Sequence, residues 1–214
     1  MSYKETNRRF VVGIAGGSGS GKTTLALRML EESRKIGISG LIFHLDNYYQ
    51  PLSHLSLAER QAYNFDHPRA IDFDLAYQHL KKLCAGETIE QPIYNFKTHT
   101  RRKQTLRLEP TQFVVVEGIY ALYPKKFLKL YNYMMFVSTG IATAVLRRVR
   151  RDIMERGRTM DGAKHQILST VLPMYETYGK PTQKNAHFSI NWEGEDIPVK
   201  ATEGLVRMVR DFFR

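Results

Sequence analysis

The sequence predicts an α/β fold in which a parallel β-sheet forms the core and helices flank it. Short apolar runs alternate with stretches of helical periodicity, which is the pattern of repeated βα units. The apolar runs are almost continuously hydrophobic, as expected for strands that are covered on both faces. The chain of 214 residues is long enough for one such domain, 1–214, and no linker or internal repeat divides it.

Four apolar runs are expected to form the sheet, and a β-hairpin is expected outside it. The segments Thr88–Tyr94 and Thr105–Leu108 have strand character and are separated by the polar stretch NFKTHTRRKQ. We therefore expect a hairpin over 88–108 that leaves the main sheet. The strands of the main sheet are expected at Phe10–Ile14, Leu41–Leu45, Phe113–Val116 and Tyr133–Val137.

Capping residues mark the expected helix boundaries. Ser56 and Glu59 have the spacing of a capping box, which predicts the start of a short helix. Asp72 or Asp74 is expected to cap the next helix, and Gly86 is expected to end it. The later helices are expected at Ala142–Glu155, Asp161–Tyr178 and Thr202–Phe213.

The composition is strongly basic, with 32 Lys and Arg against 21 Asp and Glu and a net charge of +11. Such a charge suits nucleic acid or small polyanions such as ATP. The basic residues are partly concentrated in Lys97–Lys103 and Arg147–Arg158. Apart from Phe96 beside the first, these segments lack the interleaved aromatic side chains of a single-strand binder. We therefore expect a small polyanionic ligand and no nucleic acid.

Cysteine content and hydropathy predict a cytoplasmic protein. The one cysteine, Cys84, cannot form an internal disulfide, which suits a reducing compartment. No apolar run approaches the roughly 20 residues that cross a bilayer. The opening residues, MSYKETNRR, contain no apolar segment of the kind a secretory signal needs. We expect no membrane association.

The string GGSGSGKTT lies between the first apolar run and the first helical stretch. It fits the P-loop pattern G-x-x-x-x-G-K-[ST] in the context that this motif requires. Backbone N–H groups of such a turn, and the helix that begins near Lys22, bind a polyphosphate. Lys22 is expected to reach the β- and γ-phosphates, and the Thr23 hydroxyl to bind Mg²⁺. The residues expected to bind the nucleoside triphosphate are Gly16, Gly17, Ser18, Gly19, Ser20, Gly21, Lys22, Thr23 and Thr24.

A P-loop alone does not separate kinases from GTPases or ATP-driven motors, but carboxylates at neighbouring strand ends are informative. Glu117 follows the strand FVVV and is the best candidate for a carboxylate near Mg²⁺. Asp46 follows LIFHL and could accept a proton from a substrate hydroxyl that attacks the γ-phosphate. Asp46 could instead hold a metal-bound water, or do both. A carboxylate at a strand end is also a common helix cap.

The chain resembles the uridine–cytidine kinases of the phosphoribulokinase and uridine kinase superfamily, in order and spacing, over roughly Phe10 to Ala186. The resemblance implies a P-loop NTPase fold, a Mg²⁺-dependent kinase and a homo-oligomer, specifically a homotetramer. The segments that carry it are GGSGSGKTT, LDNYY, NFDHPRAIDFD, PIYNFKTHTR, VVVEGIYAL and RRVRRDIMERGR.

The resemblance also implies roles for residues around a nucleoside. Asp46 maps to the general base and Tyr49 to the nucleoside site. Asp66 maps to the carboxylate that accepts hydrogen bonds from the ribose 2′- and 3′-hydroxyls, so a 2′-deoxyribose would leave it partly unsatisfied. We hypothesise that His99 reads uracil and cytosine, because a neutral imidazole offers one donor and one acceptor. The residues expected to form apolar walls around the base are Phe65, Tyr94 and Phe96.

The arginine-rich stretch resembles the lid of this family, over 140–178. Several guanidinium groups over a transferring phosphoryl group would neutralise its charge. On a helix, Arg147 and Arg151 share one face, and we expect Arg148 to face elsewhere. By alignment with the family, Arg151 and Arg156 fall on phosphate-contacting positions. The nucleoside-contacting positions of this region are Arg148, Arg158 and Gln166.

The chain departs from the family pattern at several positions. Ser138 stands where the family usually carries Asp, and Ala142 and Ala144 replace an Asp and a frequently charged residue. The segment 186–192 reads AHFSINW where the family usually reads A-D-x-I-I-P, which puts the last strand and the nearby adenine pocket in question. Asn95 stands where Asp is common. The family resemblance therefore implies no preference between ATP and GTP as the phosphate donor of this chain.

Taken together, the sequence predicts ATP-dependent phosphorylation of the 5′-hydroxyl of uridine or cytidine. Asp46, Lys22, Arg151 and Arg156 are the expected catalytic residues, and Thr23, Glu117 and Asp46 the expected metal ligands. One alternative is a kinase of the same superfamily that acts on another hydroxyl acceptor, such as a phosphorylated sugar. Another is a basic NTP-binding module that recognises RNA.

Overall fold

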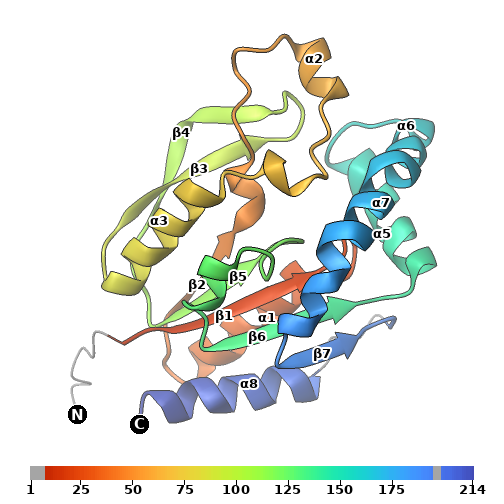
Figure 1. The fold of residues 1–214 in the computed structure, drawn as a ribbon. Coiled ribbons are helices and arrows are strands. Elements are labelled where there is room, and N and C mark those ends of the chain that lie inside the picture. Colours follow the sequence, from red (N-terminus) through yellow and green to blue (C-terminus); the bar gives the residue numbers. More distant parts are fainter. Residues whose placement is uncertain (1–7, 195–198) are drawn as a thin grey trace.

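The computed structural model describes residues 8–194 and 199–214, and the opening residues on which the expectation about a secretory signal partly rests lie outside this range. Within the described ranges, the core is a five-stranded parallel sheet in the order β2-β5-β1-β6-β7 (Figure 1). The fold class is therefore confirmed. The four predicted strands are present with small differences at their ends, and β7 is an additional strand. The strands are β1 Phe10–Gly16, β2 Gly40–His44, β5 Phe113–Glu117, β6 Tyr133–Ser138 and β7 Phe188–Asn191.

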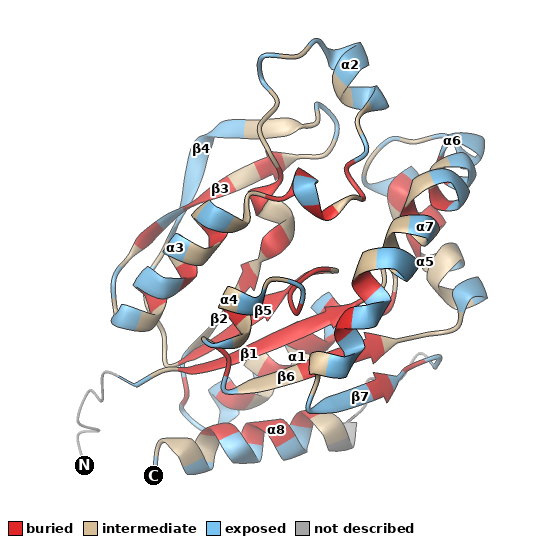
Figure 2. Ribbon diagram, viewed as in Figure 1, coloured by how far each residue is buried: buried red, intermediate tan, exposed pale blue. Residues whose placement is uncertain are grey.

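The sheet separates two hydrophobic cores. Successive residues of a strand point to opposite faces, so Val11 and Val12 of β1 belong to different cores. All residues of β1 are buried, which explains why the strand reads as a continuous apolar run (Figure 2). One face is covered by helices α1, Lys22–Lys35, and α8, Val199–Phe212. The opposite face packs against helix α3, Phe73–Ala85.

The predicted helix caps are present. Ser56 and Glu59 form a reciprocal capping box at the start of helix α2, Leu57–Ala62. Of the two candidates for the cap of α3, Asp72 is the one that accepts a hydrogen bond, from the Leu75 N–H. Gly86 ends this helix with φ of 89°. The other helices are α4 Lys125–Leu128, α5 Ile141–Met154, α6 Met160–Gln166 and α7 Leu172–Met174.

The predicted hairpin is present, as strands β3, Ile89–Asn95, and β4, Thr100–Leu108, but its turn is shorter than expected. The polar stretch at 95–104 was expected to separate the strands, and most of it is strand. The expectation was wrong because β4 is largely exposed (Figure 2), so it needs no apolar alternation. Arg101 of β4 anchors the hairpin, since it donates to the carbonyl oxygens of Tyr48 and Tyr49.

The predicted helix at 161–178 is helical but not a regular α-helix. After α6, π-helical turns at Ile167–Val171 and Tyr175–Gly179 flank α7. Pro173 has no N–H to donate to the preceding turn, which favours a widened hydrogen-bond pattern. No helix among the described residues is long and apolar enough to span a membrane.

Candidate active site

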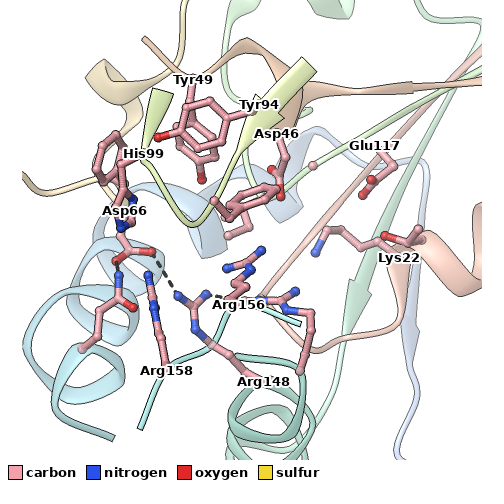
Figure 3. Close-up of a pocket in the computed structure, with 18 residues that line it drawn as sticks. Lys22, Asp46, Tyr49, Asp66, Tyr94, His99, Glu117, Arg148, Arg156 and Arg158 are labelled. Atoms are coloured by element: carbon pink, nitrogen blue, oxygen red, sulfur yellow. Dashed lines mark hydrogen bonds and ion pairs between the residues drawn. The ribbon is translucent and has the colours of Figure 1, made fainter. Parts of the chain in front are cut away.

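The carboxyl ends of β1, β2 and β5 open into a cleft that side chains of the sheet ends, the hairpin and α5 line. Lys22 and Glu117 lie at one end, Asp66 and His99 at the other (Figure 3). The cleft brings together all the predicted catalytic, nucleoside and metal residues. These are Lys22, Thr23, Asp46, Tyr49, Phe65, Asp66, Tyr94, Phe96, His99, Glu117, Arg148, Arg151, Arg156, Arg158 and Gln166.

The glycine-rich turn joins β1 to α1 and brings Ser18, Lys22 and Thr23 to the cleft. Gly19 has φ of 82°, and a Cβ there would lie 2.5 Å from the carbonyl oxygen of Ala144. Only glycine permits this approach between the turn and helix α5. The other predicted triphosphate residues do not border the cleft. They are Gly16, Gly17, Gly19, Ser20, Gly21 and Thr24.

Lys22 is buried beside the carboxylates of Asp46 and Glu117. Its ammonium group donates to the carbonyl oxygen of Gly17 at 2.8 Å, a contact that holds the side chain along the loop. Burial lowers the pKa of Lys22, and the two carboxylates oppose this shift. A phosphate near Lys22 would therefore meet a cation that is already poorly hydrated.

Glu117 places a carboxylate at the end of β5, next to His44. The Nδ1 atom of His44 lies 2.7 Å from Glu117 Oε1, and these residues pair in register across β2 and β5. Burial raises the pKa of Glu117, but the hydrogen bond from His44 and the charge of Lys22 outweigh it and leave the pKa below its ordinary value. Glu117 is therefore an ionised carboxylate in the buried floor of the cleft.

The residues at this end suit a magnesium ion that is bound together with phosphates. Among the described residues, no group of three or more His, Cys, Asp or Glu side chains could hold a metal by itself. Mg²⁺ commonly uses one or two carboxylates together with substrate phosphates and water. Glu117, Asp46 and the Thr23 hydroxyl supply such a partial set on one wall of the cleft.

Asp46 lies in a 3₁₀ turn, Leu45–Tyr48, directly after β2. Its carboxylate has no hydrogen-bond or ion-pair partner among the described residues. The neighbouring Asn47 accepts from the Tyr94 N–H at 3.3 Å and donates to Gln91 at 3.2 Å, which fixes the turn against the hairpin. The Asp46 carboxylate is thus held by its backbone and is open to the cleft.

Asp66 forms the other end of the cleft and is 8% exposed. Its Oδ2 atom accepts from Thr170 at 2.7 Å and from Gln166 at 3.3 Å. Arg148 lies 3.7 Å from Oδ1. The backbone is held as well, since the Tyr120 hydroxyl donates to the Asp66 carbonyl oxygen. Oδ1 is the oxygen with acceptor capacity left for a ligand.

Aromatic rings enclose the space between Asp66 and Asp46. Tyr49 and Tyr94 lie 5.1 Å apart between ring centroids, and Tyr94 and Phe96 are also 5.1 Å apart. His99 stacks on Phe65 at 5.0 Å with an angle of 14° between the rings. His99 has φ of 51°, a strained conformation for a residue with a side chain. Burial and nearby arginines lower the pKa of His99, so its imidazole is neutral at pH 7.

Several buried polar atoms at this cleft lack a partner. Buried polar groups are nearly always hydrogen-bonded in native proteins, so unpaired ones indicate where a ligand or water binds. Among the described residues, the unpaired atoms that belong to cleft-lining side chains are the Tyr94 hydroxyl, Arg151 Nε and Gln166 Oε1. Arg148 Nε has no hydrogen bond but lies 3.4 Å from Asp152 Oδ2.

The arginines of α5 face the glycine-rich turn from across the cleft. Arg148 and Arg151 both donate to the Ser18 hydroxyl, at 2.9 and 3.1 Å. The expectation that Arg148 faces away from the face of Arg147 and Arg151 is therefore wrong with respect to Arg151. Residues three apart on a helix are also neighbours, so both side chains reach the same hydroxyl.

The atypical segments contact one another. Ser138 donates to the Ile190 carbonyl oxygen at 3.1 Å, which ties β6 to β7. The ring of Trp192 packs so closely on Gly21 that a Cβ at this glycine would lie 2.5 Å away. The Arg147 guanidinium lies 5.7 Å from the Trp192 ring centroid. The last strand is therefore present, and an indole ring lies beside the glycine-rich turn.

Sequence reasoning missed three side chains at the site. His44 on β2 contacts Glu117, Thr170 holds Asp66, and Asp152 on α5 lies among the arginines. Position at a strand end could have indicated His44. Asp152 is an acidic residue within an arginine-rich run, and its contact set depends on the turn after α5. Thr170 gave no signal, because its partner is 104 residues away.

Comparison with known proteins gives the relatives of the chain. It is 39% identical to the uridine kinase of Lactiplantibacillus plantarum over 196 residues, which cover 92% of this chain and 93% of that protein. It is 38% identical to the uridine kinase of Halobacterium salinarum over 198 residues, covering 92% and 87%.

Solved structures show the same fold. D-glycerate 3-kinase from Cryptococcus neoformans has a TM-score of 0.63 at 19% identity and covers 88% of each chain. Shikimate kinase from Acinetobacter baumannii has a TM-score of 0.51 at 12% identity and covers 95% of this chain and 94% of that one. The model of the Phosphoribulokinase / Uridine kinase family matches residues 11–196. The chain belongs to the Phosphoribulokinase / Uridine kinase family.

Proposed function

We propose that the protein transfers the γ-phosphoryl group of ATP to the 5′-hydroxyl of uridine and cytidine, giving UMP or CMP and ADP. The observation that carries this proposal is the position of Asp46. Its open carboxylate shares one cleft with the phosphate-binding Lys22 and with Asp66, which suits a ribose diol. The uridine kinases that match most of the chain support uridine as an acceptor.

Asp46 is the general base of this reaction. The 5′-hydroxyl of the bound nucleoside gives its proton to the Asp46 carboxylate as its oxygen attacks the γ-phosphorus. The bond between this phosphorus and the β–γ bridging oxygen breaks, and ADP leaves. The carboxylate is suited to this role because it has no competing partner among the described side chains.

Cationic side chains stabilise the charge that develops on the phosphoryl group. Lys22, Arg151 and Arg156 line the same cleft, where their charges would act on the transferring phosphoryl group. Glu117, Thr23 and Asp46 would hold Mg²⁺, which supplies charge neutralisation on the phosphate oxygens when bound. The backbone of the glycine-rich turn donates N–H groups to the same phosphates.

Asp66 selects the ribose. Its free oxygen accepts hydrogen bonds from the 2′- and 3′-hydroxyls, and Arg148 fixes the carboxylate from the side. A 2′-deoxynucleoside leaves a buried acceptor unsatisfied, and such a loss lowers kcat/KM strongly. Arg158 and Gln166 complete this end of the cleft.

The aromatic rings hold the base, and His99 reads its edge. The neutral imidazole presents one donor and one acceptor, which suits uracil O4 with one tautomer and the cytosine 4-amino group with the other. We therefore propose that both pyrimidines are substrates. From the sequence we also propose one domain and a cytoplasmic location, and from the family resemblance alone a homotetramer.

The proposal is tested by measuring ADP release with a panel of ribonucleosides, 2′-deoxyribonucleosides and phosphorylated sugars. Uridine and cytidine are expected to be turned over, and their deoxy forms at least about 100-fold less efficiently. Turnover of a phosphorylated sugar, with none of uridine or cytidine, would contradict the assignment. Binding of RNA with a steep salt dependence and no nucleoside-stimulated ADP release would do the same.

A further inference from the structure

One buried carboxylate lies at the centre of the arginines of the lid. Asp152 is on α5, and its side chain is 0% exposed. Its Oδ1 atom lies 3.3 Å from Arg151 and 3.3 Å from Arg156. Its Oδ2 atom lies 3.4 Å from Arg148 and 3.1 Å from Arg158. Four guanidinium groups from two turns of helix and the following loop therefore meet at a single side chain.

We propose that Asp152 is a positioning residue, which holds the lid arginines over the cleft before the substrates arrive. This inference rests on the proposed function for its catalytic consequence. Its structural part, the hold on the arginines, is independent of the substrate.

Asp152 also shapes the loop that follows α5. The Arg158 N–H donates to the Asp152 carbonyl oxygen at 3.1 Å, and the Arg158 side chain donates to Oδ2 at 3.1 Å. Gly157, with φ of 70°, allows the chain to turn back for this contact. Residue 158 is thus fixed through both its backbone and its side chain by one residue.

Three of the arginines that Asp152 holds also contact other walls of the cleft. Arg148 and Arg151 donate to Ser18 in the glycine-rich turn. Arg156 lies 4.1 Å from the ring centroid of Phe96 at the hairpin tip. The carboxylate therefore links the lid to the two other elements that enclose the cleft.

Charge explains why this carboxylate is needed. Among the described carboxylates, only Asp152 and Asp66 lie within ion-pair distance of Arg148, Arg151, Arg156 and Arg158. Two positive charges thus remain for a phosphate. Without Asp152 the excess of positive charge grows, and guanidinium groups that are largely removed from water repel one another. The lid would then separate from the cleft unless an anion took the place of the carboxylate.

The kinetic test uses Asp152→Asn, which keeps the shape and removes the charge. We expect kcat to fall about 100-fold, because the arginines no longer meet the transferring phosphoryl group. The KM for uridine should rise about tenfold, and the KM for ATP less than about threefold, because the glycine-rich turn and Lys22 are unchanged. The matched control is Glu155→Gln, an exposed carboxylate of the same segment, with wild-type kinetics expected.

The structural test uses arginine labelling with phenylglyoxal, read by mass spectrometry without substrates. In the wild type, Arg148, Arg156 and Arg158 should label more slowly than the exposed Arg150. In Asp152→Asn, Arg156 and Arg158 should label at about the rate of Arg150. Asp152→Glu restores the charge and should recover at least about tenfold of the lost kcat.

Wild-type kcat in Asp152→Asn, or arginine labelling that the substitution leaves unchanged, would overturn the inference. If Asp152→Asn does not fold, the wild type and Asp152→Glu carry the test. Protected arginines in both support the inference, and arginines as reactive as Arg150 in the folded wild type overturn it. If the wild type phosphorylates no nucleoside, the proposed function fails, while the labelling result still decides whether Asp152 holds the arginines.

Discussion

The two ends of the cleft differ in their balance of charge. At the end of the glycine-rich turn, one ammonium group, that of Lys22, lies among the carboxylates of Asp46 and Glu117. Under α5, four guanidinium groups face the carboxylates of Asp66 and Asp152. The first end has an excess of negative charge and the second an excess of positive charge. A divalent cation would balance the negative charge of the first end, and a polyphosphate the positive charge of the second. This explains why neither end is neutral by itself.

The ends also differ in how they are built. The first is composed of residues at or just after the ends of three neighbouring strands, so the backbone places them. The second is composed of long side chains from α5, the following loop and the hairpin, which depend on contacts with each other. Substitutions at the first end should therefore act mainly on chemistry and metal binding, and those at the second mainly on substrate selection and lid order.

The largest effect is expected for Asp46→Asn. Removal of the general base should lower kcat by about 1,000-fold and leave nucleotide binding within about threefold, because the amide keeps the shape but accepts no proton. Steady-state kinetics and ATP titration measure the two quantities. Asp161→Asn, an exposed carboxylate on α6, is the control. A kcat within about tenfold of the wild type would exclude Asp46 as the base.

A smaller loss is expected for Glu117→Gln, which removes the ionised carboxylate of the floor. We expect kcat to fall about 100-fold and the Mg²⁺ concentration for half-maximal activity to rise about tenfold. Replacement of His44 by Gln, which removes the partner of Glu117, should cause a smaller change in the same direction. A Mg²⁺ requirement unchanged in Glu117→Gln would place the metal elsewhere.

Asp66→Asn tests the other end. The KM for uridine should rise about 30-fold, and discrimination against 2′-deoxyuridine should fall by a similar factor, because the charged acceptor for the ribose diol is lost. Thr170→Val removes one supporting hydrogen bond and should raise this KM only about threefold. Unaltered discrimination in Asp66→Asn would show that the ribose is selected by other groups.

The smallest effect is expected from pH. Burial and the arginines Arg158, Arg60 and Arg156 lower the pKa of His99 from 6.5. The KM for uridine should therefore be flat from pH 8 to about 6.5 and rise only below the lowered pKa. The unfolded chain takes up this proton first, so stability also decreases as the pH falls below 6.5. In His99→Asn both changes should diminish, and a KM that rises between pH 8 and 7 would contradict a neutral imidazole.

Much of the first end could be predicted from the sequence. The strand β1, the glycine-rich turn and the start of α1 are contiguous, so a local pattern contains the whole phosphate-binding element. Asp46 and Glu117 could be predicted because carboxyl ends of parallel strands meet at one edge. Outside this end, the extent of the hairpin strand β4 could not be predicted, since an exposed strand carries no apolar alternation.

The residues of the second end could be identified only with both the family resemblance and the structure. Its nucleoside residues were predicted only through the family motifs, and their roles remain predictions. The contact of Asp152 with Arg158 could not be predicted, because it arises where the loop after α5 turns at Gly157. The side on which Arg148 lies was predicted wrongly for a different reason: residues three apart on a helix are also neighbours, so Arg148 and Arg151 reach the same Ser18 hydroxyl.

The sequence by itself determined the α/β class, the strands after which the candidate catalytic residues lie, and the phosphate-binding turn. These could be predicted because hydrophobic periodicity and glycine spacing are local properties. Only the tertiary structure decided which charges meet. The ion pair between Asp66 and Arg148 depends on a distance across the fold. The ion pairs of Asp152 depend on how the loop after α5 folds back on the helix, and burial then sets the strength of both.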